Sequence, residues 1–194
     1  MDGVLIYLAS QSLRRAELLR QLGVPFQVVK VHVDETVGSG EESAACARRL
    51  AEAKAQAALL SLGSDITQPI LAADTLVSID GTILGKPADR TEGLAMLARL
   101  SGRNHQVFSA VTLWHDGVMR GALNVSTVKF RAINAEEAVN YWQSSEPKGK
   151  AGGYAIQGRG ALFIERLEGS YSGVMGLPLF ETAALLQAAD IQIL

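Results

Sequence analysis

The sequence predicts an α/β domain with a mixed β-sheet. Apolar runs suited to strands alternate with helical patterns in the first half of the chain, and the second half holds two long β-rich runs joined as a hairpin. At 194 residues, the chain is long enough for one well-filled core, or for one domain with two lobes. No internal repeat or composition break marks a linker, so we expect a single domain over residues 1–194, with two lobes around a cleft.

The elements of the first half follow from apolar periodicity and from glycines that end helices. A short apolar run at residues 4–9 predicts a buried strand, and residues 12–22 predict a helix that Gly23 ends. Residues 26–33 are β-rich, and an alanine-rich helix is expected over residues 41–62.

A buried strand and a capped helix are expected next. Ile70–Ile79 is a continuous apolar run, and the dipeptide Asp80-Gly81 behind it is typical of a turn. Asp89 stands where it can cap a helix that runs to about Leu100, with a glutamate three residues later in the capping-box position.

The second half begins with a predicted hairpin. Strands are expected at residues 106–115 and 118–130, joined at Asp116-Gly117. Asn134 then caps a helix that runs to about residue 144.

The C-terminal part is organised around a glycine-rich loop, "EPKGKAGGYAIQGRGA", at residues 146–161. A strand is predicted at residues 162–167, a helix after Pro178, and a short terminal strand at residues 191–194.

The composition argues against several classes of partner. A net charge of −2 gives no reason to expect DNA or an anionic membrane. Cys46 is the only cysteine, which excludes a disulfide within the chain and a thiolate metal site. The first residues lack the basic region of a signal peptide, and no apolar run approaches the roughly 20 residues of a membrane span. We therefore expect a cytoplasmic protein with no membrane and no nucleic-acid partner.

Two adjacent arginines occupy an unfavourable place. In "LASQSLRRAELL" (residues 8–19), Arg14 and Arg15 fall in the first turn of the predicted helix, where free N–H groups and the helix dipole already present positive charge. Each cation there costs about 0.3–1 kcal/mol. A bound polyanion would reverse this cost, because helix N–H groups and guanidinium groups would bind it together. The pair predicts that a phosphate chain binds at this turn.

A carboxylate interrupts the apolar strand "ILAADTLVSI". A buried, unpaired Asp74 would cost several kcal/mol, so it needs a metal, a lysine or a proton. One interpretation is an aspartate that caps a nearby turn, and the other is a general base or metal ligand at the edge of a cleft. Lys86, in "GKP" twelve residues later, fits the second interpretation but is equally compatible with an ordinary solvated lysine.

Lys54 and Glu35 are further candidates. Lys54 falls on the apolar stripe of its helix, where it either extends its ammonium to solvent or points it into a cleft. Glu35 follows Asp34 at the end of a β-rich segment, and adjacent acids are common in solvated turns. Mg²⁺, however, is bound through one or two carboxylates together with substrate phosphates, so Glu35 and Asp74 would suffice.

The glycine-rich loop carries Lys150 and Gln157. Glycines let the backbone approach a ligand closely, and successive N–H groups can bind an anion. The chain has no Walker loop and no dinucleotide-binding fingerprint, and its three histidines lack the spacing of a zinc site.

Taken in order, these motifs resemble the Maf family of nucleoside triphosphate pyrophosphatases. The matching pieces are "LASQSLRRAELL", "DE" (34–35), "KA" (54–55), "AADT" (72–75), "GKP" with Asp89, "FSAVT", "KAGGYAIQG", "GSYSGVMGLP" and Glu181. They follow the family's order and cover nearly the whole chain.

The resemblance implies a two-lobed α/β fold like that of the inosine triphosphate pyrophosphatases, with the active site in the central cleft. It implies cleavage of a nucleoside triphosphate between the α and β phosphates, with Mg²⁺ or Mn²⁺ as cofactor, by a cytoplasmic homodimer. The "KAGGYAIQG" motif is similar to the branch that acts on dTTP and UTP, rather than to the branch that acts on 7-methyl-GTP.

The resemblance also implies roles for single residues. Asp74 matches the family's proposed proton acceptor, and Thr75 and Gln157 match positions linked to substrate choice. The resemblance places Ser10, Arg14 and Arg15 in a phosphate-binding turn, and Glu35, Lys54, Asp74, Lys86 and Gln157 in the catalytic cleft. From the residues themselves we add Lys150 to substrate binding and expect Glu35 and Asp74 to hold the metal.

This sequence departs from the family pattern at two places. Leu13 replaces a proline before the two arginines, and "GVM" at residues 173–175 stands where Asn-Val-Val is usual. Gly173 therefore lacks an asparagine side chain that could contact substrate or metal.

Two other functions are compatible with the sequence. The chain could be a non-enzymatic, nucleotide-responsive regulator of cell division and septum formation. It could also be an enzyme that removes modified nucleotides such as 7-methyl-GTP and so prevents their incorporation, which would change only the base pocket.

Overall fold

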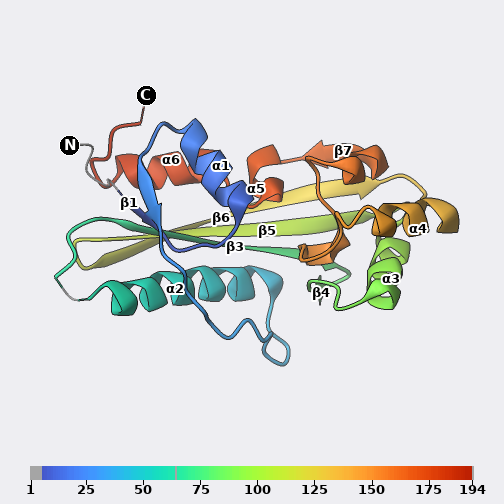
Figure 1. Cartoon of the computed structure of the whole chain (residues 1–194), viewed down its shortest axis with the longest axis horizontal. Coiled ribbons are helices and arrows are strands. Elements are labelled where there is room, and N and C mark those ends of the chain that lie inside the picture. Colours follow the sequence, from blue (N-terminus) through green and yellow to red (C-terminus); the bar gives the residue numbers. More distant parts are fainter. Residues whose placement is uncertain (1–5, 64, 194) are drawn as a thin grey trace.

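The computed structural model places a mixed β-sheet at the centre of the molecule (Figure 1). It describes residues 6–63 and 65–193, and in these ranges seven strands form one sheet in the order β2-β1-β3-β5-β6-β7, with β4 beside β3. The strands are β1 (Ile6–Leu8), β2 (Phe26–Val28), β3 (Ile70–Ile79), β4 (Thr82–Leu84), β5 (Asn104–His115), β6 (Val118–Phe130) and β7 (Ile164–Glu168). β1 pairs in parallel with β2 and β3, and the other pairs are antiparallel.

Helices cover both faces of the sheet. They are α1 (Leu13–Gln21), α2 (Ser43–Leu62), α3 (Arg90–Leu100), α4 (Ala135–Gln143), α5 (Tyr171–Met175) and α6 (Leu179–Gln187), with 3₁₀ turns η1 (Ala151–Gly153) and η2 (Arg159–Phe163). In Figure 1, α2 lies along one face, α1, α5 and α6 lie on the other, and α3 and α4 lie at the far end of the long strands. In the part of the chain that the structure describes, no helix has the length and apolar character needed to cross a bilayer.

Two large apolar cores at the two ends of the sheet explain the two-lobed shape, and two smaller clusters pack α2 on the sheet. One core packs α1 and α6 on β1, β3 and β5, with Leu19, Leu113 and Leu186 at its centre. The other lies at the far end, where Phe130 and Tyr154 pack with residues of α3 and α4. Strands β3, β5 and β6 run through both lobes, so one continuous sheet joins them.

The predicted turns and helix starts are confirmed. Asp80 and Asp116, each followed by a glycine, both have positive φ, as a two-residue hairpin turn requires. Asp89 caps α3 by accepting from the backbone N–H of the third residue after it, and Asn134 forms a full capping box with Glu137. These features depend on local sequence, which explains why they could be predicted.

Several predicted boundaries differ from the structure. Of residues 26–33, only Phe26–Val28 form a strand, because the neighbouring strand β1 ends at Leu8 and offers no partner beyond that point. The strand predicted at residues 162–167 begins at Ile164, after the 3₁₀ turn η2.

The ends of the chain are described only in part. Residues 191–193 do not form the predicted terminal strand, and residue 194 lies outside the described residues. The same holds for residues 4 and 5 of the first predicted strand.

Along one edge of β3, the middle of the strand has no partner strand, and the site lies there. β1 pairs with β3 only at Ile70 and Leu71, and β4 pairs with β3 only from Val77 onward. Residues 72–76 therefore have a partner strand on one side only, which is β5. The open edge lies at the middle of the molecule, between the two lobes.

Candidate active site

A cavity of about 1000 Å³ lies at the open edge of β3. Its walls come from the start of α1, the segment after β2, α2, β3, the segment after β4, the glycine-rich loop and α5. The cavity thus draws side chains from nearly the whole sequence. Its volume is within the range of small-molecule and cofactor sites.

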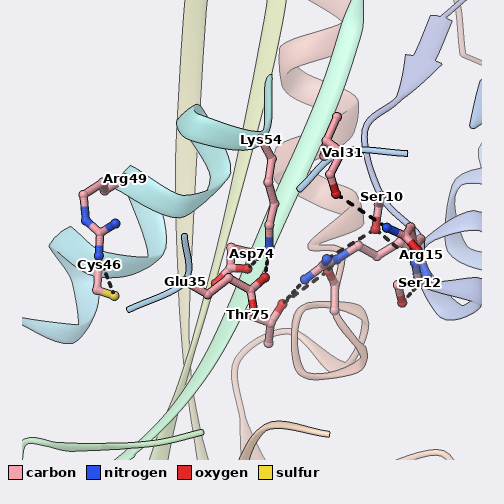
Figure 2. Close-up of polar contacts among 12 residues, drawn as sticks. Ser10, Ser12, Arg15, Val31, Glu35, Cys46, Arg49, Lys54, Asp74 and Thr75 are labelled. Atoms are coloured by element: carbon pink, nitrogen blue, oxygen red, sulfur yellow. Dashed lines mark hydrogen bonds and ion pairs between the residues drawn. The ribbon is translucent and has the colours of Figure 1, made fainter. Parts of the chain in front are cut away.

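One wall carries a chain of alternating charges, and Figure 2 shows its members Glu35, Lys54 and Asp74. The ammonium of Lys54, on α2, lies 2.5 Å from Asp74 Oδ1 and 2.8 Å from Glu35 Oε1. Lys86 Nζ lies 2.9 Å from the other oxygen of Glu35. Asp74 is 6% exposed and Lys54 is 9% exposed. The buried carboxylate in the middle of β3 is therefore paired with a lysine.

The charge pattern keeps Glu35 ionised. Burial raises the pKa of its carboxyl, but hydrogen bonds from Lys54 and Lys86 outweigh burial and lower the pKa to about 2. Lys54 reaches both carboxylates because α2 packs on the face of β3 toward which Asp74 points. The arrangement presents two carboxylates, each bonded to a lysine, at one side of the cavity.

The opposite wall carries the two arginines. Thr75 follows Asp74 in β3, and successive strand residues point to opposite faces, so Thr75 faces α1 and α5. Arg15 donates from Nη2 to Thr75 Oγ1 (3.2 Å), from Nη1 to Ser10 Oγ (3.4 Å) and from Nε to the carbonyl oxygen of Gly176 (2.8 Å). Arg14 donates from Nε to the carbonyl oxygen of Met175 (3.2 Å).

The C-terminal end of α5 explains how two cations are tolerated at the start of α1. Met175 and Gly176 carry carbonyl groups at the end of α5, where a helix presents partial negative charge. Burial lowers the pKa of Arg15, and the charge of Asp74 partly opposes that effect. The guanidinium groups of both arginines therefore lie away from the positive end of α1 and contact the negative end of α5.

The cavity wall has an excess of positive charge. Its cations are Arg14, Arg15, Lys54, Lys86 and Lys150, and its carboxylates are Glu35 and Asp74. Five cations against two carboxylates leave three positive charges. Burial lowers the pKa of the Lys150 ammonium, and the nearby charge of Arg14 lowers it further. Such a cavity favours a polyanionic ligand, which would relieve this repulsion.

Nine of the ten candidate residues line the cavity, namely Ser10, Arg14, Arg15, Glu35, Lys54, Asp74, Thr75, Lys86 and Lys150. Gln157 is the exception, because its side chain is exposed and is not part of the cavity wall. The residues just before it, 154–156, are buried. Glu146 then accepts hydrogen bonds from the backbone N–H groups of Arg159 and Gly160, which holds the following turn away from the cavity.

Sequence reasoning missed the carbonyl groups that orient the arginines and the hydroxyl of Ser109, which donates to Thr75 Oγ1. A backbone carbonyl leaves no sign in a sequence, because every residue has one. It also missed Tyr154, whose hydroxyl bonds His105 Nε2 at 2.8 Å and whose ring lies at the cavity wall. In the sequence, the only indication of a role for Tyr154 is its position within the glycine-rich motif.

The donor set fits a metal that is shared with a substrate. Within residues 6–63 and 65–193, no group of three or more His, Cys, Asp or Glu side chains could hold a metal by itself. Glu35 and Asp74 are nonetheless brought close together by their shared contact with Lys54. Mg²⁺ is usually held by one or two carboxylates, substrate phosphates and water, so two carboxylates are enough.

A sequence model of the Maf family, described as "Maf-like protein", matches residues 5–189. The chain belongs to the Maf family. A relative from Burkholderia orbicola (strain AU 1054), named dTTP/UTP pyrophosphatase, is 50% identical over 96% of this chain and 94% of its own length. A relative of the same name from Methylobacillus flagellatus is 48% identical over 97% of this chain and 94% of its own length.

The fold also occurs in a solved structure of a protein with much lower sequence identity than these two relatives. The Staphylococcus aureus Ham1 protein matches with a TM-score of 0.52 and 14% identity, over 95% of this chain and 96% of that chain. At this identity the match concerns the fold alone. It agrees with the two-lobed α/β fold expected from the sequence.

Proposed function

We propose that this chain is a nucleoside triphosphate pyrophosphatase that hydrolyses dTTP and UTP to the monophosphate and pyrophosphate. The observation that carries the proposal is the cavity at the open edge of β3. It combines three excess positive charges with a buried carboxylate, Asp74, on the wall opposite the arginines. The names of the relatives that are about half identical support the same reaction and the same substrates.

In the proposed reaction, the triphosphate binds along the arginine wall. Arg14 and Ser10, which line the cavity, bind phosphate oxygens, and Lys86 and Lys150 stabilise the remaining charge. The free N–H groups at the start of α1 add to this binding. Together these groups hold the substrate with its α-phosphorus near Asp74.

Asp74 is the proposed general base. It accepts a proton from a water molecule as the water oxygen forms a bond to the α-phosphorus. The bond from that phosphorus to the oxygen bridging the α and β phosphates breaks, and pyrophosphate leaves with the bridging oxygen. Lys54, bonded to Asp74 Oδ1 at 2.5 Å, orients the carboxylate and stabilises the developing charge.

We further propose that Glu35 and Asp74 hold a divalent cation, Mg²⁺ or Mn²⁺, together with substrate phosphates. When bound, such an ion neutralises phosphate charge and orients the water nucleophile. The low pKa of Glu35 keeps this ligand deprotonated at neutral pH.

The base would occupy the apolar end of the cavity, where Val77, Leu84 and Tyr154 form the wall. Thr75 and Gln157 remain the proposed determinants of base choice. Because Gln157 is exposed, it has to move inward with its loop to contact a base.

We also propose a cytoplasmic homodimer, as the family resemblance implies. Sedimentation or light scattering of the full chain measures the oligomeric state directly. A monomer at micromolar concentration would contradict this part of the proposal without affecting the proposed reaction.

The proposed activity is tested with a panel of nucleoside triphosphates in the presence of Mg²⁺ or Mn²⁺, with pyrophosphate and phosphate assayed separately. We expect pyrophosphate from dTTP and UTP and little free phosphate. Release of phosphate alone, or no turnover with either pyrimidine, contradicts the proposal. Efficient turnover of 7-methyl-GTP with none of UTP would instead support the removal of modified nucleotides.

A further inference from the structure

The short helix α5 carries both carbonyl groups that hold the cavity arginines. Arg14 and Arg15 donate to the carbonyl oxygens of Met175 and Gly176 at distances of 3.2 and 2.8 Å. Ser109 donates to the carbonyl oxygen of Gly173 at 2.5 Å and to Thr75 Oγ1 at 3.1 Å. The position of α5 therefore helps to set the positions of both arginines.

A helix of five residues does not hold its own position, because isolated short helices are marginal in water. The N-cap Ser170 anchors α5. Its side chain accepts from the N–H of Gly173 at 3.0 Å, and its own N–H donates to Ser126 Oγ, on β6, at 2.9 Å. The hydrogen bond from Ser109 on β5 is thus one anchor of α5, and the hydroxyl of Ser126 on β6 is another.

Two side chains outside the cavity complete this anchor. Ser126 Oγ donates to Asn124 Oδ1 at 2.8 Å, and Asn124 Nδ2 donates to Glu181 Oε1, on α6, at 2.7 Å. Asn124 is oriented from both ends, since its oxygen accepts and its nitrogen donates. Neither Asn124 nor Glu181 is part of the cavity wall.

The glycine of α5 fits the same arrangement. A Cβ atom at Gly173 would lie 3.1 Å from Asn124 Oδ1, which is tighter than ordinary packing. The carboxamide of Asn124, on β6, therefore lies directly against α5, and glycine at position 173 leaves room for it.

Glu181 is not explained by stability alone. Its Oε1 accepts from Asn124, but its Oε2 is buried and has no hydrogen-bond partner among the described residues. A buried acceptor without a partner costs free energy, so the second carboxylate oxygen of Glu181 does not contribute to stability through a hydrogen bond.

We propose that Asn124 and Glu181 are positioning residues, which hold α5 so that its carbonyl groups fix Arg14 and Arg15 for the triphosphate. This inference rests on the proposed pyrophosphatase function. Asn124 and Glu181 act through Ser126 and α5, and do not touch the substrate.

The test compares KM and kcat for dTTP in Asn124→Ala and Glu181→Ala with those of the unchanged protein. We expect KM to rise about tenfold, because Arg14 and Arg15 are no longer held in the orientation that binds the triphosphate. We expect kcat to change by less than about threefold, because the position of Asp74 does not change. Glu181→Gln retains an oxygen that accepts from Asn124, so its KM stays within about twofold of the unchanged value. Asn140→Ala and Glu136→Ala are matched controls, because both side chains are exposed on α4.

A double-mutant cycle separates positioning from a general loss of structure. In an Arg14→Ala/Arg15→Ala background, Asn124→Ala should change the affinity for pyrophosphate, measured by calorimetry, by less than about twofold. An Asn124→Ala effect as large as in the unchanged background overturns the proposal. So does an unaltered KM in folded Asn124→Ala and Glu181→Ala proteins.

Two further outcomes are distinguishable. If Asn124→Ala does not fold, Ser126→Ala removes only one hydroxyl from the same chain of contacts and should give the same rise in KM. If the unchanged protein hydrolyses no triphosphate, the proposed function fails. Pyrophosphate affinity then still tests the positioning role, which is contradicted if Asn124→Ala and Ser126→Ala bind pyrophosphate as the unchanged protein does.

Discussion

Asp74 and Lys54 share a 2.5 Å contact where neither residue is more than 9% exposed. Asp74→Asn keeps the size of the side chain and an oxygen that can accept from Lys54, and Lys54 keeps its contact with Glu35. We therefore expect the fold to persist. The proposed base is lost, so kcat for dTTP should fall by at least ~10²-fold. Circular dichroism and steady-state kinetics check both expectations, and near-normal turnover in a folded protein would remove Asp74 from the mechanism.

The two arginines should differ in what they contribute to stability. Arg15 donates through three nitrogens to three different elements or loops, whereas Arg14 donates through one. Arg15→Ala should lower the free energy of unfolding by about 1–3 kcal/mol, and Arg14→Ala should leave it nearly unchanged. Both should weaken triphosphate binding. Urea unfolding and calorimetry measure the two effects, and equal stability losses would contradict this division.

His105 predicts a pH-dependent loss of stability. It is 2% exposed, and burial lowers its pKa to about 4. In the unfolded chain the histidine has a pKa near 6.5 and binds a proton below that pH, whereas in the folded chain it stays neutral down to about pH 4. The free energy of unfolding therefore falls as the pH falls from about 6.5 to 4. The loss should reach about 2 kcal/mol at pH 5 relative to pH 7.5.

Urea unfolding at these two pH values measures the loss. The aromatic neighbours of His105, Phe130 and Tyr154, do not titrate in this range. His105→Gln can still bond the Tyr154 hydroxyl but has no proton to gain, so its stability should be flatter between pH 7.5 and 5. An identical pH slope in both proteins would assign the effect to other groups.

The elements show where sequence reasoning succeeds. The starts of α3 and α4 and the two hairpin turns follow from caps and glycines within a few residues, and they were predicted. The strand expected over residues 26–33 depends on whether β1 continues beside it, which local sequence does not contain. The location of the site could be predicted from charged side chains in otherwise apolar segments, such as Asp74 in a strand and Lys54 in a helix. The backbone carbonyls that orient the arginines could not be predicted.

The glycine-rich loop carries a prediction about base choice. UTP and dTTP should be preferred over CTP by roughly ten- to hundredfold, since a mismatched base leaves polar groups unpaired. If the loop moves Gln157 onto the base, Gln157→Glu should reduce this preference, because a carboxylate cannot donate to O4. Measured kcat/KM values for the three nucleotides check this. An unchanged preference in Gln157→Glu would show that the exposed position of Gln157 persists in the complex and that other residues select the base.

At the scale of the whole molecule, the cavity lies where the two lobes meet. Strands β3, β5 and β6 continue through both cores, and the missing neighbours of β3 over residues 72–76 leave the only break along that edge between β1 and β4 in the described residues. The Maf-family chain and the Ham1 protein share this fold at 14% identity. The site therefore depends on the topology of the sheet as well as on particular side chains.

A ligand in this cavity should stabilise the whole chain, because its walls come from both lobes. A dUTP analogue with an imido group between the α and β phosphates binds without being cleaved. At 100 times its Kd, it should add about 2.7 kcal/mol to the free energy of unfolding and raise Tm by roughly 5–10 °C. Arg14→Ala should remove most of this shift at the same ligand concentration, and Asn140→Ala should not. Deoxyuridine, which has no phosphates, should give almost no shift, because the three excess positive charges of the cavity then have no partner. An equal shift with deoxyuridine would mean that the cavity does not select for the phosphate chain.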